Sequence, residues 1–229
     1  MGMSNPLGQA GPWSKNPDKL VHSWIGFQGK PFPCGGYTDG PVTNLTIGEV
    51  INVRFWTFGL KNITATPPLP KTIPTARHGG GSCEFSLSYD GMKTWKVIGQ
   101  YTKSCPDIYT EWPVLIPDNI PECTDPKTCF FSMSWIAHKV PQFYHHCANV
   151  VVRGGSNYTA LPSFALPTLD MTVVDLPPNK TLVSAVGDNE LQSPGPDENE
   201  IKMNKNGDFK HGGKLMDKGL NLNLVYRQG

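Results

Sequence analysis

The sequence predicts an all-β protein built as an antiparallel β-sandwich with long loops. Short segments in which apolar and polar residues alternate recur along the chain, as expected for half-buried strands. Glycine (24 residues) and proline (22 residues) are frequent enough to divide the chain into short elements and to disfavour long helices. Turn-forming dipeptides lie between the alternating segments. Together these observations favour a sandwich over a helical or α/β fold.

Residues 1–46 are rich in Gly, Pro, Asn and Ser and are predicted to form loops. After residue 46, the strongest local pattern in the sequence predicts a β-hairpin. Its first strand covers 83–89, the turn is Asp90-Gly91, and the second strand covers 94–98. The other segments with alternation are 51–56, 112–116, 130–136 and 147–152.

The end of the chain has a different composition. An edge strand is predicted at 168–176, and from Ser193 onward the apolar residues lose their periodicity. We assign residues 1–197 to the sandwich and residues 198–229 to a polar, flexible tail.

The charge of the chain is low and balanced. Charged residues make up 17% of the 229 positions and the net charge is +1, which argues against a nucleic-acid-binding protein and a charge-rich disordered chain. No run of 18 consecutive apolar residues is present, so no membrane-spanning helix is predicted.

Cysteines and glycosylation sequons indicate a secreted protein. The even cysteine count allows three disulfides, and the absence of a Cys-x-x-Cys pair gives little support to a structural zinc site. Four Asn-x-Ser/Thr sequons agree with secretion; they begin at Asn44, Asn62, Asn157 and Asn179. The start of the chain lacks a basic region followed by an apolar one, so we interpret it as a mature chain from which a signal peptide has been removed.

Histidines are the best candidates for chemistry, because hydrolase, nucleotide and zinc-protease motifs are absent from the sequence. His78 stands in the segment Arg77-His78-Gly79-Gly80-Gly81-Ser82-Cys83, where glycines keep its surroundings open. Such a loop suits a surface metal ligand. The alternative is a loop histidine whose nitrogens bond to backbone or water.

A second candidate segment is 142–152. As a strand, it would place Gln142, Tyr144 and His146 on one face, and Phe143 and His145 on the other. Tyr144 and Gln142 could then lie together beside a metal, or Tyr144 could be an ordinary buried tyrosine bonded to backbone. Adjacent strand residues point to opposite faces, so His145 and His146 are not expected to bind one ion together.

Several of these motifs, in the same order, give the chain a resemblance to fungal lytic polysaccharide monooxygenases of auxiliary activity family eleven. The resemblance extends from residue 1 to about residue 155, and Pro194-Gly195-Pro196 resembles the end of the family's core. The motifs that carry it are Met3-Ser4-Asn5-Pro6, Phe32-Pro33-Cys34, Gly79 to Asp90, Thr94 to Ile98, Ser104-Cys105-Pro106, Trp135 to Val140, Phe143-Tyr144 and Cys147 to Val151.

The resemblance implies an immunoglobulin-like sandwich that holds one copper ion in a histidine brace. His78 would be the internal ligand, Tyr144 would lie at the axial position, and Gln142 would occupy a neighbouring place that is often glutamate. The other two ligand atoms would come from an N-terminal histidine, expected just before Met1. His145 and His146 stand where the family usually has methionine and asparagine.

The resemblance also implies a function. The expected activity is oxidative cleavage of chitin or a related β-linked polysaccharide, with O2 or H2O2 and an external electron donor. The expected enzyme is a secreted monomer, either free outside the cell or associated with the cell wall. Trp13 and Trp24 are candidates to contact the polymer, or alternatively pack within their loops.

Cysteine order together with the resemblance suggests the pairs Cys34–Cys147, Cys83–Cys105 and Cys123–Cys129. Two other readings keep the fold without catalysis: a copper-binding surface protein, and a carbohydrate-binding module without metal.

Overall fold

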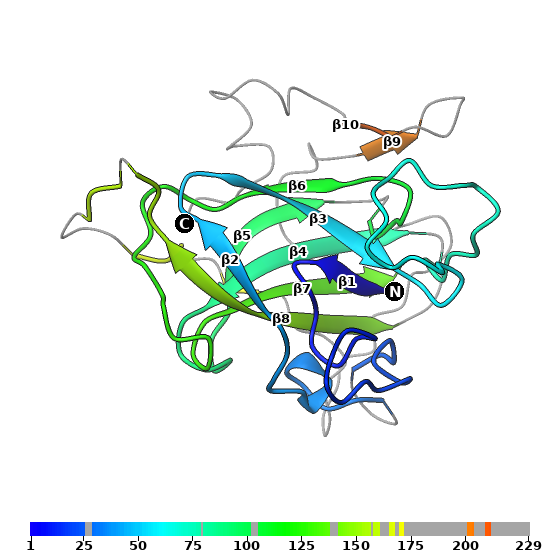
Figure 1. Cartoon of the computed structure of the whole chain (residues 1–229), viewed down its shortest axis with the longest axis horizontal. Helices are drawn as coiled ribbons and strands as arrows, with labels where there is room; N and C mark the ends of the chain where they lie inside the picture. The colour runs from blue at the N-terminus through cyan, green and yellow to red at the C-terminus, as the bar shows by residue number, and fades with distance from the viewer. Residues whose placement is uncertain are drawn as a thin grey trace.

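A computed structural model of the chain shows two β-sheets that face one another (Figure 1). The structure describes residues 1–25, 29–78, 80–101, 105–137, 142–156, 158–160, 165–167, 170–171, 201–203 and 209–211. The smaller sheet has the order β1-β3-β6 and the larger has the order β2-β8-β7-β4-β5. Within the described residues the one helical element is a short 3-10 turn at Cys34–Gly36, so the predicted all-β class is confirmed.

The strands of the smaller sheet are antiparallel to one another. They are β1 (Gly2–Asn5), β3 (Val50–Trp56) and β6 (Trp112–Leu115). The larger sheet contains β2 (Val42–Thr46), β4 (Gly81–Ser88), β5 (Lys96–Tyr101), β7 (Phe130–Ala137) and β8 (Phe143–Arg153). All its pairs are antiparallel except that of β2 with β8, which is parallel.

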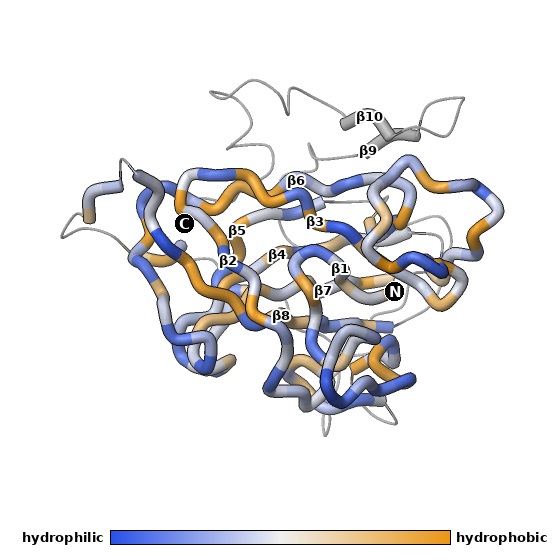
Figure 2. Tube along the Cα trace, viewed as in Figure 1, coloured by the Kyte–Doolittle hydropathy of each residue, from blue (hydrophilic) through white to orange (hydrophobic). Residues whose placement is uncertain are grey.

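The core lies between the two sheets and is made of the inward-facing residues of both. Tyr101 of β5 meets Trp112 of β6 across the interface, with ring centroids 5.1 Å apart. Phe55 of β3 packs on the same tryptophan at 6.2 Å. Apolar and polar residues alternate along the strands, which Figure 2 shows as changes of colour along each tube. β6 buries every second residue, whereas β4 and β7 are buried along their whole length and β8 along nearly all of it, so the centre of the larger sheet is covered on both faces.

The six segments with predicted alternation all form strands. The structure differs from the prediction in residues 1–46, where β1 and β2 lie in a stretch that was expected to be loop. Strand β8 also begins at Phe143, before the predicted start at Cys147, and so includes Tyr144. Of the edge strand expected at 168–176, the described part is Asp170 and Met171, and Asp170 forms an isolated bridge with Lys96.

Three disulfides join the cysteines as the resemblance suggested: Cys34 with Cys147, Cys83 with Cys105, and Cys123 with Cys129. The first links the 3-10 turn to β8, and the second links β4 to the segment that precedes β6. The first therefore fixes the turn at Cys34–Gly36 on β8, and the second fixes the segment around Cys105 on the start of β4, which follows the His78 loop.

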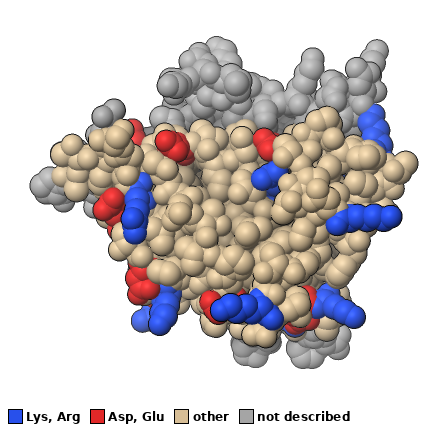
Figure 3. Space-filling view, in the orientation of Figure 1, with Lys and Arg blue, Asp and Glu red and all other residues tan. Residues whose placement is uncertain are grey.

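The predicted tail contains a short antiparallel pair of strands, β9 (Ile201–Met203) and β10 (Phe209–His211). The other residues of 198–229 lie outside the described residues, so the boundary at residue 197 stays a prediction. In the described part of the chain no helix has the length and apolar character that a membrane crossing requires. On the face shown in Figure 3, charged side chains lie mostly near the margins.

Candidate metal centre

The loop before β4 presents His78 to solvent. His78 is exposed and has a positive φ of 46°, and the N–H of Gly80 donates to the carbonyl of Arg77 at 2.7 Å to close the turn. Arg77 also pairs with the buried carboxylate of Asp107 at 2.7 Å. Burial raises the pKa of Asp107, while the charge of Arg77 opposes that rise. The loop is therefore held at both sides of the imidazole.

An aromatic stack supports the His78 ring from below. Trp135 of β7 and Tyr144 of β8 are partners in the sheet register, and their rings stack with centroids 4.4 Å apart. The imidazole of His78 is nearly parallel to both, at 5.7 Å from Trp135 and 6.1 Å from Tyr144. The indole N–H of Trp135 donates to the carbonyl of Gly80 at 3.1 Å. Trp135 thus positions the loop both by stacking and by a hydrogen bond.

Tyr144 and Gln142 lie together, as the strand period predicted. The hydroxyl of Tyr144 donates to the side-chain oxygen of Gln142, so its partner here is a side chain and not the backbone. Burial raises the pKa of Tyr144 to about 12. The phenol is therefore protonated at neutral pH and acts as a neutral polar group beneath His78.

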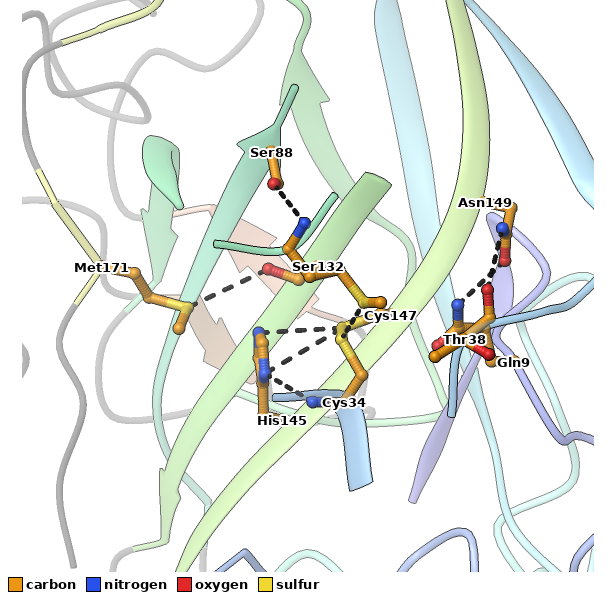
Figure 4. The surroundings of a disulfide bond; sticks show 10 residues. Gln9, Cys34, Thr38, Ser88, Ser132, His145, Cys147, Asn149 and Met171 are labelled. Atoms are coloured by element: carbon orange, nitrogen blue, oxygen red, sulfur yellow. Dashed lines mark hydrogen bonds between the residues drawn. A yellow bond between two sulfur atoms is a disulfide. The ribbon is translucent and has the colours of Figure 1, made fainter. Parts of the chain in front are cut away.

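The two histidines that follow Tyr144 point to opposite sides of β8, as predicted. His145 accepts a hydrogen bond at Nδ1 from the backbone N–H of Cys34, at 3.1 Å (Figure 4). His146 instead faces the interior between the sheets, where its neighbour Tyr144 also lies. The two imidazoles therefore belong to different environments and cannot share one ion.

His145 belongs to a cluster with the disulfide Cys34–Cys147. Ligand atoms of these three residues lie within 4.8 Å of one another, and among the described residues this is the one group of three or more such side chains. Both sulfurs are bonded to each other, so neither is a thiolate that could bind a metal. The imidazole is held by Cys34 and packs edge-on against Trp95 at 4.9 Å. Its role here is structural.

This environment predicts an acid-sensitive fold. Burial lowers the pKa of His145 to about 3, whereas an unperturbed histidine titrates near 6.5. Between these values the unfolded chain binds a proton that the folded chain does not. The free energy of unfolding should therefore fall as the pH drops from 6.5 toward 3, by roughly 1 kcal/mol for each pH unit per group.

His145→Asn isolates this contribution, because an asparagine oxygen can accept from the Cys34 N–H without titrating. Urea unfolding at pH 6.5 and pH 4.5 should show a smaller acid loss in the variant than in the parent protein. Equal losses in the two proteins would contradict the assignment.

His22 and His146 also carry imidazole nitrogens that are buried. His22 packs between Trp56, with centroids 4.5 Å apart, and Phe58, at 4.3 Å. Both of its ring nitrogens are buried without a hydrogen-bond partner, and so is Nε2 of His146. Sequence reasoning did not select His22, because no local pattern distinguishes residue 22 from the rest of its predicted loop.

The aromatic residue most exposed in the described part of the chain is not one of the two tryptophans expected to contact the polymer. Trp13 is half-buried, donates its indole N–H to the carbonyl of Gly8 at 2.7 Å and packs edge-on against Trp56, in agreement with the loop-packing alternative. Trp24 is also half-buried and packs against the main core. Phe58, which the sequence did not single out, is 67% exposed beside His22.

The sequence is similar to that of AA11 family lytic polysaccharide monooxygenase A from Aspergillus fumigatus. The two are 31% identical over 159 residues, which is 66% of this chain and 62% of the relative. The resemblance to the AA11 family is confirmed. The chain thus spans less than two thirds of the length of this AA11 monooxygenase. No family model matches the chain.

Two solved structures are similar at a lower level. One is Cel61B, a glycoside hydrolase family 61 member from Hypocrea jecorina, with 16% identity, a TM-score of 0.36 and coverage of 71% of this chain and 69% of that chain. The other is the extended catalytic domain of LPMO9A from H. jecorina, with 16% identity, a TM-score of 0.34 and coverage of 82% and 89%. Because both TM-scores are low, the assignment of this chain to the all-β class rests on its own two sheets and not on its similarity to these structures.

Proposed function

We propose that this chain is a secreted, copper-dependent lytic polysaccharide monooxygenase. The observation that carries the proposal is the exposed imidazole of His78, stacked over Trp135 and Tyr144 in a chain similar to an AA11 monooxygenase. We further propose chitin or a related β-linked polysaccharide as substrate, O2 or H2O2 as oxidant, an external reductant and a monomeric enzyme.

The residues present fit a copper ion at His78. Imidazole nitrogen is a good copper ligand, and His78 is not engaged in a hydrogen bond with any described residue. The amino group of Met1 lies near enough to add to the effect of burial in lowering the pKa of His78. A histidine placed before Met1 would therefore start close to His78, which supports the expected brace.

Tyr144 and Gln142 complete the proposed site. The phenol of Tyr144 lies beneath the His78 ring at the position proposed as axial, and Gln142 holds the phenol through its side-chain oxygen. Copper bound there would supply the redox chemistry that activates the oxidant. The protein residues would fix the ligand geometry, and the buried aromatic stack would keep water from the inner side of the site.

Surface residues support a polymeric substrate and a secreted enzyme. Phe58, beside His22, offers an exposed aromatic ring on which a sugar ring could stack. Asn44 and Asn62 are exposed and available for glycosylation, whereas Asn157 and Asn179 lie outside the described residues.

The test is to secrete the protein from a fungal host, load it with copper and incubate it with chitin, cellulose and xylan plus ascorbate. Mass spectrometry should find oxidised oligosaccharides on chitin, which disappear without reductant or after chelation of copper. The mass of the N-terminal peptide, measured on the same sample, should show a histidine before Met1. Copper binding with no oxidised product on any polymer would favour the copper-binding surface protein. Polymer binding that is indifferent to chelation would favour the metal-free binding module.

Trp135→Phe should weaken copper binding with little loss of ring stacking. The phenylalanine ring keeps the stack but cannot donate to the Gly80 carbonyl, so the loop loses one anchor. We expect about a fivefold loss of copper affinity, since a single hydrogen bond contributes about 1 kcal/mol. Calorimetric titration measures it. Trp95→Phe is the matched control, because the buried indole nitrogen of Trp95 has no hydrogen-bond partner to lose. Equal affinities in the two variants would contradict the anchoring role.

A further inference from the structure

A cavity lies between two loops of the N-terminal region. Its volume is about 520 Å³, and its lining comes entirely from residues within the segments 10–16 and 36–41. Both segments belong to the blue loops that lie beside β8 in Figure 1. The lining includes none of the residues proposed to bind or support copper, which are His78, Tyr144 and Gln142. A volume between about 300 and 1,000 Å³ is typical of sites for small ligands.

The lining combines aromatic rings with polar side chains. Ala10 is buried, and Trp13 and Tyr37 are half-buried. The polar residues of the lining are Ser14, Lys15, Asn16, Thr38 and Asp39. All of these except Ser14 are exposed, and none of their side chains is hydrogen-bonded to another described residue. Their hydroxyl, amide and charged groups are therefore available to a ligand that enters the cavity.

The charges of the lining balance each other. Lys15 and Asp39 are its charged residues, and they have opposite signs. A phosphate or another anion would meet a carboxylate as well as an ammonium group, so the lining favours a neutral ligand. A sugar residue is neutral and has apolar C–H faces surrounded by hydroxyl groups. Such a ligand matches the combination of Trp13 and Tyr37 with polar neighbours.

Hydrogen bonds hold the two loops together in the absence of a ligand. The side-chain oxygen of Asn149 accepts from Nε2 of Gln9 at 2.9 Å, and its Nδ2 donates to the carbonyl of Thr38 at 3.5 Å (Figure 4). The hydroxyl of Tyr37 donates to the carboxylate of Asp18. One loop is thus joined to the other both through β8 and directly. A preformed site of this kind loses less conformational entropy on binding.

Trp13 connects the cavity with the start of the chain. Its indole N–H donates to the carbonyl of Gly8 at 2.7 Å, and its ring packs edge-on against Trp56 at 5.6 Å. Trp56 is in turn the strand partner of Gly2. The ring that packs within its loop therefore also lines the cavity. Through Trp56 it is linked to the end of the chain where the proposed histidine brace would form.

We propose that this cavity binds a short stretch of sugar residues from a β-linked polysaccharide. Trp13 and Tyr37 contact the apolar faces of the sugar, and Asn16 and Asp39 form hydrogen bonds with its hydroxyl groups. A polysaccharide held there is anchored beside the loops that pack on β1. The choice of a β-linked polysaccharide rests on the proposed function, whereas the cavity and its lining do not.

Titration of the metal-stripped full chain with soluble sugar hexamers tests the proposal. The probes are the β-linked hexamers of N-acetylglucosamine and of glucose. The readout is the indole N–H signal of Trp13 in heteronuclear NMR spectra, identified by its loss in Trp13→Phe. At least one hexamer should shift this signal. Asn16→Ala/Asp39→Ala should bind that hexamer at least about tenfold more weakly, because each lost hydrogen bond costs about fivefold in affinity.

Asp118→Ala/Asn119→Ala is the matched control. These two residues are also exposed, follow β6 and do not line the cavity, so the double variant should bind like the parent. The proposal is overturned if neither hexamer shifts the Trp13 signal, or if the two double variants bind equally well. Because no copper is present, failure of the proposed function appears separately: a chain that binds the hexamer but, when loaded with copper, yields no oxidised product.

Discussion

His78→Ala is expected to reduce the yield of oxidised oligosaccharide by more than about 100-fold. The substitution removes the internal imidazole ligand, and changes even to groups that only support a metal ligand cost 10–100-fold in affinity or activity. The fold should be unaffected, because His78 is exposed and lies in a loop. Product yield by mass spectrometry and the copper resonance spectrum measure the effect.

His145→Asn is the control for this variant, since His145 is a buried histidine engaged with the backbone of Cys34 and lies outside the proposed copper site. It should keep the product yield and the copper spectrum of the parent. Retention of activity in His78→Ala would show that another group supplies the internal ligand, and the assignment of His78 would then be wrong.

Gly81→Ala should destabilise the protein strongly. Gly81 opens β4 with a φ of 138°, and an added Cβ would lie 2.0 Å from the carbonyl oxygen of Ile136 and 2.7 Å from the indole nitrogen of Trp135. The clash is with the backbone of the neighbouring strand, so β4 must move away from β7. We expect a loss of about 3 kcal/mol or more in the free energy of unfolding, from backbone strain and steric overlap together.

Gly91→Ala provides the matched comparison. Gly91 also has a positive φ, 71°, but an added Cβ would meet nothing within 4 Å. Its cost should be the backbone term alone, about 1 kcal/mol. Urea unfolding of both variants gives the difference. If Gly81→Ala costs no more than Gly91→Ala, the close approach of β4 and β7 at this point is not as described.

The contact between β4 and β7 at Gly81 affects both the stability of the fold and the position of the His78 loop. Gly81 lies three residues after His78, and the same strand contact brings the Trp135 indole to the Gly80 carbonyl. A shift of β4 would therefore also move the His78 loop. Copper affinity in Gly81→Ala should fall together with stability, whereas Gly91→Ala should retain the affinity of the parent.

Local patterns in the sequence predicted most strands of the two sheets, but not β1 and β2. The hairpin of β4 and β5 is encoded by alternation on both sides of Asp90-Gly91, because neighbours in the chain also pair in the sheet. β1 is only four residues long, and β2 pairs in parallel with β8, more than 100 residues later. A short segment shows too few periods to reveal a strand, and nothing within it identifies a remote partner.

The sequence by itself determined which residue types could act and which face of a strand they occupy. The two-residue period separated His145 from His146 and joined Tyr144 to Gln142, and the glycines around His78 indicated an open loop. The tertiary structure alone decided that His78 lies over Trp135 and Tyr144, and that His22 packs against Trp56 and Phe58. Periodicity is a property of neighbouring residues, whereas these contacts arise when distant segments bury their apolar faces together, and that choice depends on the packing of the whole core.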